Sequence, residues 1–113
     1  RKGDLEAAIR EYQEALRINP NYGMAHTNLG AIYHKKGDFD AAIREFREAL
    51  RIDSNAEDAH FLLGMVHCDK GEFDAATREF EETLRINPNN ATAHNNLAFA
   101  HNAKRQGKGG HTT

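Results

Sequence analysis

Histidines are the side chains of this sequence best suited to chemistry, and it contains seven of them. His60 and His67 lie seven residues apart, and so do His94 and His101. In a helix, seven residues cover two turns, or roughly 10 Å along the axis. One metal ion that binds each ring nitrogen at about 2 Å does not bridge that distance. A metal site would need ligands from adjacent helices, so we expect these histidines to fill slots between packed helices instead.

The single cysteine, Cys68, is the other candidate for chemistry. It has no obvious activating base nearby in the sequence, so we expect a packing or groove residue and no nucleophile. The sequence also has no Gly-rich phosphate loop and no nucleophile motif, and its acid pairs lie in exposed charge ladders. We therefore predict that the chain is not an enzyme and needs no metal or cofactor.

Composition is typical of one soluble globular domain, with 113 residues, of which 28% are charged and 39% hydrophobic. A formal net charge of -2 predicts no general attraction to nucleic acid. No segment is long and apolar enough to predict membrane insertion. The chain starts at Arg1 without an initiator methionine, so we expect the natural N-terminus to be missing. We take a cytoplasmic location as the default.

One segment occurs three times with a period of 34 residues. KGDLEAAIREYQEALRINPN begins at Lys2, KGDFDAAIREFREALRIDSN at Lys36 and KGEFDAATREFEETLRINPN at Lys70. A fixed period between about 20 and 50 residues indicates an architecture of stacked repeats. The repetition therefore predicts the fold.

Each repeat contains two helical patterns joined by a tight turn. Apolar residues of the middle copy recur at helical spacing, at Phe39, Ala42, Ile43, Phe46, Ala49 and Leu50. Gly37 is suited to end one helix and Asp38 to cap the next. An Asn-Pro pair at residues 19–20 and another at 87–88 stop the second helix. One such helix pair cannot bury its apolar face alone, but stacked neighbours can.

The repeat resembles the tetratricopeptide repeat, whose signature is an aromatic residue, Leu-Gly, Tyr, Ala, an aromatic residue and Pro. The matching residues are Leu29, Gly30, Tyr33, Ala42 and Phe46, then Leu63, Gly64, Ala76, Phe80 and Pro88. The chain departs from the signature at the Trp slot, which holds His26, His60 and His94, and at the Tyr slot, which holds His67 and His101.

The resemblance implies an all-α solenoid of stacked antiparallel helix pairs, about six helices forming a right-handed superhelix. We expect the array to cover residues 1–104, as a half repeat (2–22), two full repeats (23–56 and 57–90) and a half repeat (91–104). Residues 105–113 would follow as a flexible tail.

The segment HFLLGMVHC, residues 60–68, is apolar nearly all round, which exceeds the needs of one buried stripe. Core positions should keep one chemical type in every copy, but three positions here change type. Phe61 corresponds to Thr27 and Asn95, Leu62 to Asn28 and Asn96, and Met65 to Ala31 and Phe99. We expect Phe61, Leu62 and Met65 to form an exposed apolar patch for a partner. The alternative is that Phe61 and Met65 pack against the neighbouring unit.

In the tetratricopeptide-repeat family, the first helices of the pairs line a concave groove that binds peptides. The resemblance implies this role for Asn28, Ala31, His34, Asp58, Phe61, Leu62, Met65, Asn95, Asn96 and Phe99, with Met24, Thr27 and Cys68 among the flanking positions. Asn28 and Asn96 match an asparagine ladder that holds a peptide backbone in glycosyltransferase-linked arrays, and Leu62 interrupts that ladder.

Chaperone-binding members of the family clamp a C-terminal carboxylate with Lys, Arg and Asn at five slots. The corresponding residues here are Thr27, Ala31, Leu62, Thr92 and Asn96. We therefore expect a protein or peptide partner that is not a chaperone tail.

Two other functions stay open. The chain begins with a second helix and ends with a first helix, so its two ends are complementary halves of one repeat. Molecules could stack head to tail into a self-assembling structural array by self-association of these terminal half repeats. A less favoured alternative is an accessory domain of a larger enzyme.

Overall fold

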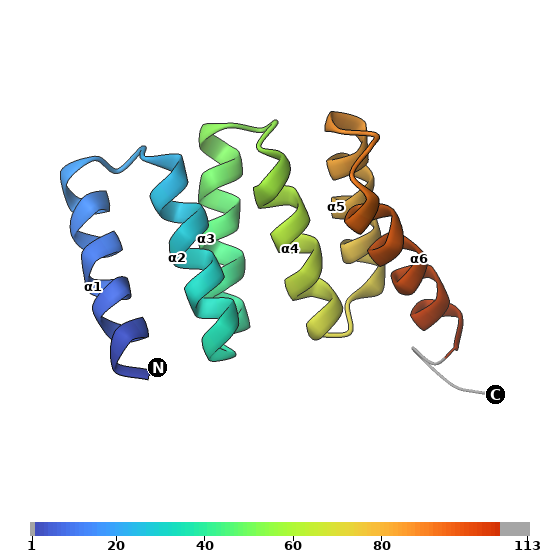
Figure 1. The fold of residues 1–113 in the computed structure, drawn as a ribbon, viewed down its shortest axis with the longest axis horizontal. Helices are drawn as coiled ribbons and strands as arrows, with labels where there is room; N and C mark the ends of the chain where they lie inside the picture. The colour runs from blue at the N-terminus through green and yellow to red at the C-terminus, as the bar shows by residue number, and fades with distance from the viewer. Residues whose placement is uncertain (1, 107–113) are drawn as a thin grey trace. The chain divides into compact units, whose positions relative to one another are not determined.

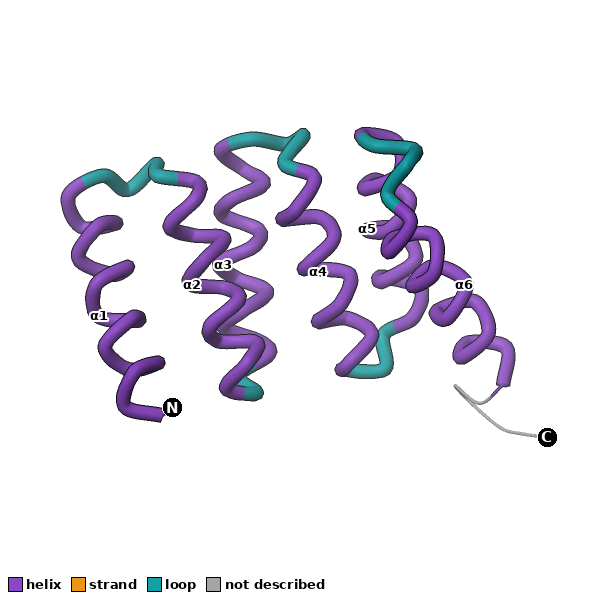
Figure 2. The backbone as a smooth tube through the Cα atoms, viewed as in Figure 1, coloured by secondary structure: helices purple, strands orange, loops and turns teal. Residues whose placement is uncertain are grey.

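The computed structural model describes residues 2–106, which form six α-helices and no strand (Figures 1 and 2). The helices are α1 (Lys2–Ile18), α2 (Gly23–Lys36), α3 (Phe39–Ile52), α4 (Glu57–Asp69), α5 (Phe73–Ile86) and α6 (Ala91–Gln106). The predicted all-α fold of helix pairs is confirmed. Residues 105 and 106 of the predicted tail belong to α6, and residues 107–113 lie outside the described residues.

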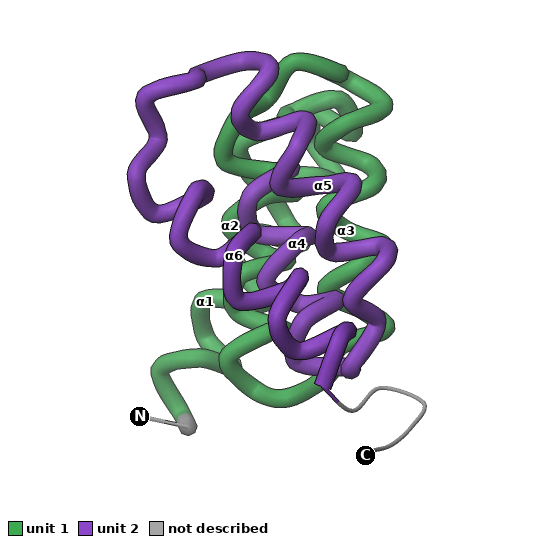
Figure 3. Tube along the Cα trace, turned by 90° about the vertical axis from the view of Figure 1, so that its right-hand side faces the viewer, with its two compact units in different colours: residues 1–59 green, residues 60–113 purple. Residues whose placement is uncertain are grey.

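The chain divides into two compact units after Ala59, within α4 (Figure 3). In unit 1, α2 packs against both α1 and α3. In unit 2, α5 packs against α6, and the ring of Phe61 in α4 lies 5.9 Å from the ring of Phe80 in α5. Each unit therefore has a core built between consecutive helices.

An aromatic ring of the second helix lies directly on a glycine of the first helix in each full repeat. A Cβ atom added to Gly30 would lie 2.7 Å from the ring of Phe46, and one added to Gly64 would lie 2.6 Å from the ring of Phe80. Both rings are fully buried. Such a distance is shorter than any carbon contact in a packed interior, so only glycine permits this approach.

The turn between α2 and α3 has the predicted chemistry. Gly37 adopts a left-handed conformation with φ of 85°, and its N–H donates to the carbonyl of His34 at 2.9 Å. The carboxylate of Asp38 accepts a hydrogen bond from the Ala41 N–H at 3.3 Å, which caps α3. Both turn predictions are confirmed.

The equivalent turn of the next repeat is built differently. Gly71 is again left-handed, with φ of 78°, but Glu72 replaces the capping aspartate. The Glu72 carboxylate makes no cap of α5 and instead accepts a hydrogen bond from His67 Nδ1 at 2.8 Å. Glu72 therefore links the turn to His67, the residue of α4 that occupies the Tyr position of the repeat signature.

We predict that Gly64→Ala destabilises the protein by about 1–3 kcal/mol, because the buried Phe80 ring must move away from the new methyl group. Gly3→Ala is the matched control, since nothing lies within 4 Å of a Cβ at Gly3. Urea denaturation followed by circular dichroism measures both. Equal midpoints for wild type and Gly64→Ala would contradict the close contact.

A second prediction concerns Thr77, which occupies the slot held by Ile9 and Ile43 in the earlier copies. Its hydroxyl oxygen is buried without a hydrogen-bond partner among residues 2–106. Thr77→Val keeps the shape and removes the unsatisfied group, so it should stabilise the protein by about 1 kcal/mol. Thr83→Val is the control and should not stabilise, because the Thr83 hydroxyl donates to the Glu79 carbonyl at 2.9 Å.

Candidate peptide-binding surfaces

Histidines join the first helix of each full repeat to its second helix. His26 Nδ1 lies 2.8 Å from Glu45 Oε1, and His60 Nδ1 lies 2.8 Å from Glu79 Oε1. His26 Nε2 also lies 3.0 Å from the Pro20 carbonyl oxygen. A carbonyl oxygen only accepts, so Nε2 donates to it, and Nδ1 donates to an ionised Glu45 when the ring is charged.

The predicted packing role is confirmed for His26, His60 and His67, which are buried between helices. It is wrong for His94 and His101, which are exposed on α6, because no described helix follows α6 to cover them. Within residues 2–106, no group of three or more His, Cys, Asp or Glu side chains could hold a metal ion.

In unit 1, the candidate surface lies on α2. Asn28, Ala31 and His34 are half-buried on this helix, and the ring of His34 meets Phe39 edge-on at 5.7 Å. Met24 is 65% exposed at the start of α2. Thr27 is buried, and its hydroxyl donates to the Gly23 carbonyl at 3.2 Å.

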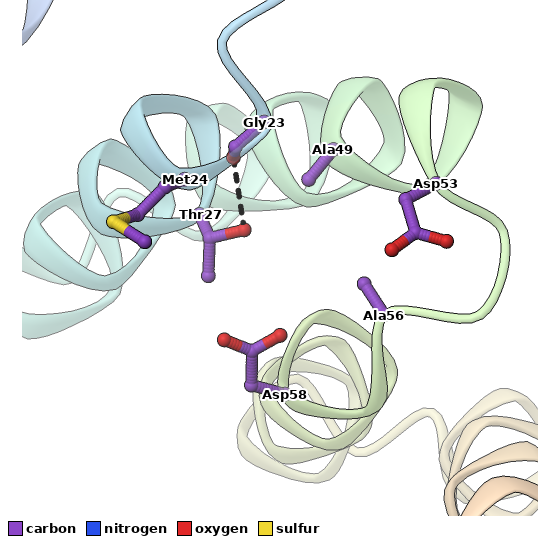
Figure 4. Close-up of a pocket in the computed structure, with 7 residues that line it drawn as sticks. All are labelled: Gly23, Met24, Thr27, Ala49, Asp53, Ala56 and Asp58. Carbon is purple, nitrogen blue, oxygen red and sulfur yellow. Dashed lines mark hydrogen bonds between the residues drawn. The ribbon is translucent and has the colours of Figure 1, made fainter.

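A pocket of about 200 Å³ adjoins this surface (Figure 4). Its lining combines the first turn of α2 with the end of α3 and the start of α4: Gly23, Met24, Thr27, Ala49, Asp53, Ala56 and Asp58. Asp53 and Asp58 contribute two carboxylates and Met24 an apolar wall, as the sticks in Figure 4 show. The pocket therefore favours an apolar or cationic group over an anionic one.

In unit 2, the expected apolar patch is largely part of the core. Phe61 and Met65 are half-buried and pack against the cluster of Ala76, Phe80 and Ala100. Leu62 is also only partly exposed. The alternative of packing therefore holds for Phe61 and Met65, although both stay partly exposed, and the role of Leu62 in a patch stays a prediction. Met65→Lys would disturb this packing, so it is not a clean test of binding.

The exposed part of the unit 2 surface lies on α6. Phe99 is 56% exposed, and its ring meets Phe73 edge-on at 6.3 Å. Asn96 Nδ2 lies 3.0 Å from the sulfur of Met65, and Asn95 Nδ2 lies 3.5 Å from Asn96 Oδ1. An exposed ring beside two side-chain amides can offer both apolar contact and hydrogen bonds to a peptide.

A sequence model of the TPR repeat matches residues 1–37, 30–68 and 66–104. These matches follow one another along residues 1–104. The chain belongs to the tetratricopeptide-repeat (TPR) family. No curated protein matches the sequence at a significant level.

A solved structure of similar fold is described as the first TPR of Spaghetti (RPAP3) bound to the HSP90 peptide SRMEEVD. The two structures agree with a TM-score of 0.89 at 22% sequence identity, over 93% of this chain and 83% of that one. At this level of identity the likeness shows the fold, an all-α TPR solenoid of helix pairs.

The five TPR slots that would clamp a terminal carboxylate carry no cationic side chain. Thr27 is buried with its hydroxyl engaged, Ala31 and Leu62 are partly exposed, and Asn96 contacts Met65. Thr92 is exposed and short. These positions offer no charged partner to a carboxylate.

Sequence reasoning missed Ala49, Asp53 and Ala56 as lining of the pocket beside α2. The family pattern assigns the groove to first helices, whereas these residues lie at the end of a second helix and in the loop after it. A signal was present in the sequence, since Asp53 replaces the Asn that stands at residues 19 and 87.

Burial raises the pKa of the Cys68 thiol above its ordinary value of 9.0, and the nearby Asp69 carboxylate adds to the shift. A raised pKa leaves little thiolate at neutral pH, which agrees with a packing role.

We predict slow alkylation of Cys68 by iodoacetamide at neutral pH, with a midpoint of the rate above pH 9.0 in the folded protein. Asp69→Asn should move the midpoint part of the way down, and unfolding in urea should remove the shift. Stopped reactions analysed by mass spectrometry give the rates. Fast alkylation of the folded chain at pH 7 would contradict this environment.

Proposed function

We propose that this TPR chain is a protein-interaction module that binds a peptide segment of a partner through the exposed faces of its first helices. The observation that carries the proposal is the surface of α6, where Phe99 is exposed beside the amides of Asn95 and Asn96. Aromatic side chains are enriched at protein interfaces, and the neighbouring side-chain amides can add hydrogen bonds to a peptide.

The base of this surface is fixed by the core beneath it. The Phe73 ring supports Phe99 from α5, and the Met65 sulfur accepts from the Asn96 amide. A side chain that is already held in place loses less conformational entropy on binding. The contact that Phe99 makes with a peptide should therefore carry a small entropic cost. Asn95 is exposed, and its amide can both donate to and accept from a peptide backbone.

Unit 1 has a second candidate surface, the pocket beside α2, which is acidic. Its carboxylates of Asp53 and Asp58 disfavour an acidic peptide, and the TPR clamp slots provide nothing to offset that effect. We infer a neutral or basic peptide with apolar side chains. We expect a transient complex, of the class that buries less than about 1,200 Å² in total.

A library of random peptides displayed on phage tests the proposal, selected on the immobilised folded chain. Phe99→Lys removes the exposed ring, and Ile18→Lys is the matched control, because Ile18 is 70% exposed at the end of α1. We expect one consensus with wild type and with Ile18→Lys, and at least tenfold weaker enrichment with Phe99→Lys.

Asn95→Leu provides a second arm, because it keeps about the same size and removes the amide donor and acceptor without adding a charge. It should weaken binding of the selected peptide without changing the urea midpoint. No consensus on the folded wild-type chain, or an unchanged consensus on Phe99→Lys, would contradict the proposed function.

A further inference from the structure

The side chains that line the pocket beside α2 accept hydrogen bonds, and none of them has a donor to offer. All the lining residues belong to unit 1, and the polar side chains among them are those of Asp53, Asp58 and Thr27 (Figure 4). The Thr27 hydroxyl donates its one proton to the Gly23 carbonyl, so its oxygen can only accept a further hydrogen bond. A group that binds to these side chains must therefore supply the donors.

The negative charge of Asp53 is not required by the turn in which this residue lies. Asp53 Oδ1 accepts a hydrogen bond from the Asn55 N–H at 3.0 Å. At the same slot of the other two copies, Asn19 and Asn87 accept the equivalent bond with an amide oxygen, at 3.2 and 3.1 Å. An amide is therefore sufficient for the turn. The second carboxylate oxygen of Asp53 bonds to no residue from 2 to 106, so it is available to a ligand.

The second carboxylate of the pocket, that of Asp58, is also available. No hydrogen bond or ion pair joins it to any residue from 2 to 106. Arg51 is the nearest arginine or lysine in the sequence, and its guanidinium is engaged elsewhere. Its Nε donates to Glu48 at 3.0 Å and its Nη2 donates to Asn21 at 3.1 Å. Neither Arg51 nor any other basic residue lines the pocket.

The rest of the lining is apolar. Met24, Ala49 and Ala56 contribute a thioether and two methyl groups, and Met24 is 65% exposed. A volume of about 200 Å³ is below that of pockets for drug-sized ligands, and it suits a single long side chain. Lysine and arginine combine an aliphatic stem, which packs on apolar surface, with a charged end that donates several hydrogen bonds.

We infer that this pocket binds the cationic end of a lysine or arginine side chain of the partner peptide, with the aliphatic stem against Met24. The inference rests on the proposed peptide-binding function and names the side chain that the pocket selects. The slots of Asp53 and Asp58 hold Asn87 and Thr92 in the next copy, neither of which is charged. We therefore expect one cationic anchor in the peptide and no repeating series of them.

An NMR titration with single capped amino acids tests the pocket without any selected peptide. The probes are the N-acetyl N-methylamides of lysine and arginine, and the neutral controls are those of norleucine and citrulline, which keep the stems and lack the charge. We expect saturable shifts of the amide signals of Thr27, Asp53 and Asp58, with a Kd of about 1–10 mM for such small ligands. The neutral controls should give no saturable shift. Comparison of the two cationic probes shows whether lysine or arginine binds more tightly.

Substitution of the two acids tests which groups hold the cation. Asp53→Asn preserves the turn, since the chain itself has Asn at that slot in two copies. Asp53→Asn and Asp58→Asn should each weaken binding of the cationic probe by about threefold, and the double variant by about tenfold. Asp40→Asn is the matched control, because Asp40 is an exposed aspartate of unit 1 outside the pocket and its loss changes the net charge equally. Circular dichroism checks that each variant is folded.

Equal binding of cationic and neutral probes would overturn the inference, and so would equal weakening by Asp40→Asn and the double variant. In the phage selection, we expect a lysine or arginine at one fixed position of the wild-type consensus, and loss of that preference alone on the double variant. A consensus without a cationic residue would overturn the inference and leave the proposed function standing. Absence of any consensus would contradict the proposed function, while the probe titration would still report on the pocket.

Discussion

The contact between an aromatic ring and a glycine determines how each helix pair of this protein is assembled. Phe46 lies on Gly30 and Phe80 lies on Gly64, at distances that exclude a Cβ atom. This contact determines which face of the first helix packs against the second helix. It therefore also determines which face of the first helix stays exposed. The histidine–glutamate pair lies beside this contact, since His26 precedes Gly30 by one helical turn and Glu45 precedes Phe46 by one residue, and it adds a polar link between the same two helices.

The same constraint explains where the functional surfaces lie. On α2 and α4, the second helix covers one side, and Asn28, His34 and Leu62 are left partly accessible on another. On α6, Ala93 and Ala100 are buried, while Ala98 and Phe99 are exposed. Within residues 2–106, no helix is long and apolar enough to span a membrane.

Most of the fold could be predicted from the sequence, because the repeat period fixes the helices, and Gly37 and Asp38 fix the turn between them. The side-chain pairs were harder to predict. His26 and Glu45 are 19 residues apart on different helices, so their contact depends on the rotation of one helix against the other. Phe61 and Met65 change type between copies, which indicated exposure, but in unit 2 both side chains pack against the cluster of Ala76, Phe80 and Ala100.

A double-mutant cycle between Gly64 and Phe80 tests the central contact most directly. Urea denaturation would give the free energy of unfolding for wild type, Gly64→Ala, Phe80→Leu and the double variant. Because leucine has no ring over residue 64, the cost of the alanine should fall in the Phe80→Leu background, with a coupling energy of about 1 kcal/mol or more. An equal cost of Gly64→Ala in both backgrounds would contradict this, and would mean that the ring and the glycine do not determine how the helix pair is assembled.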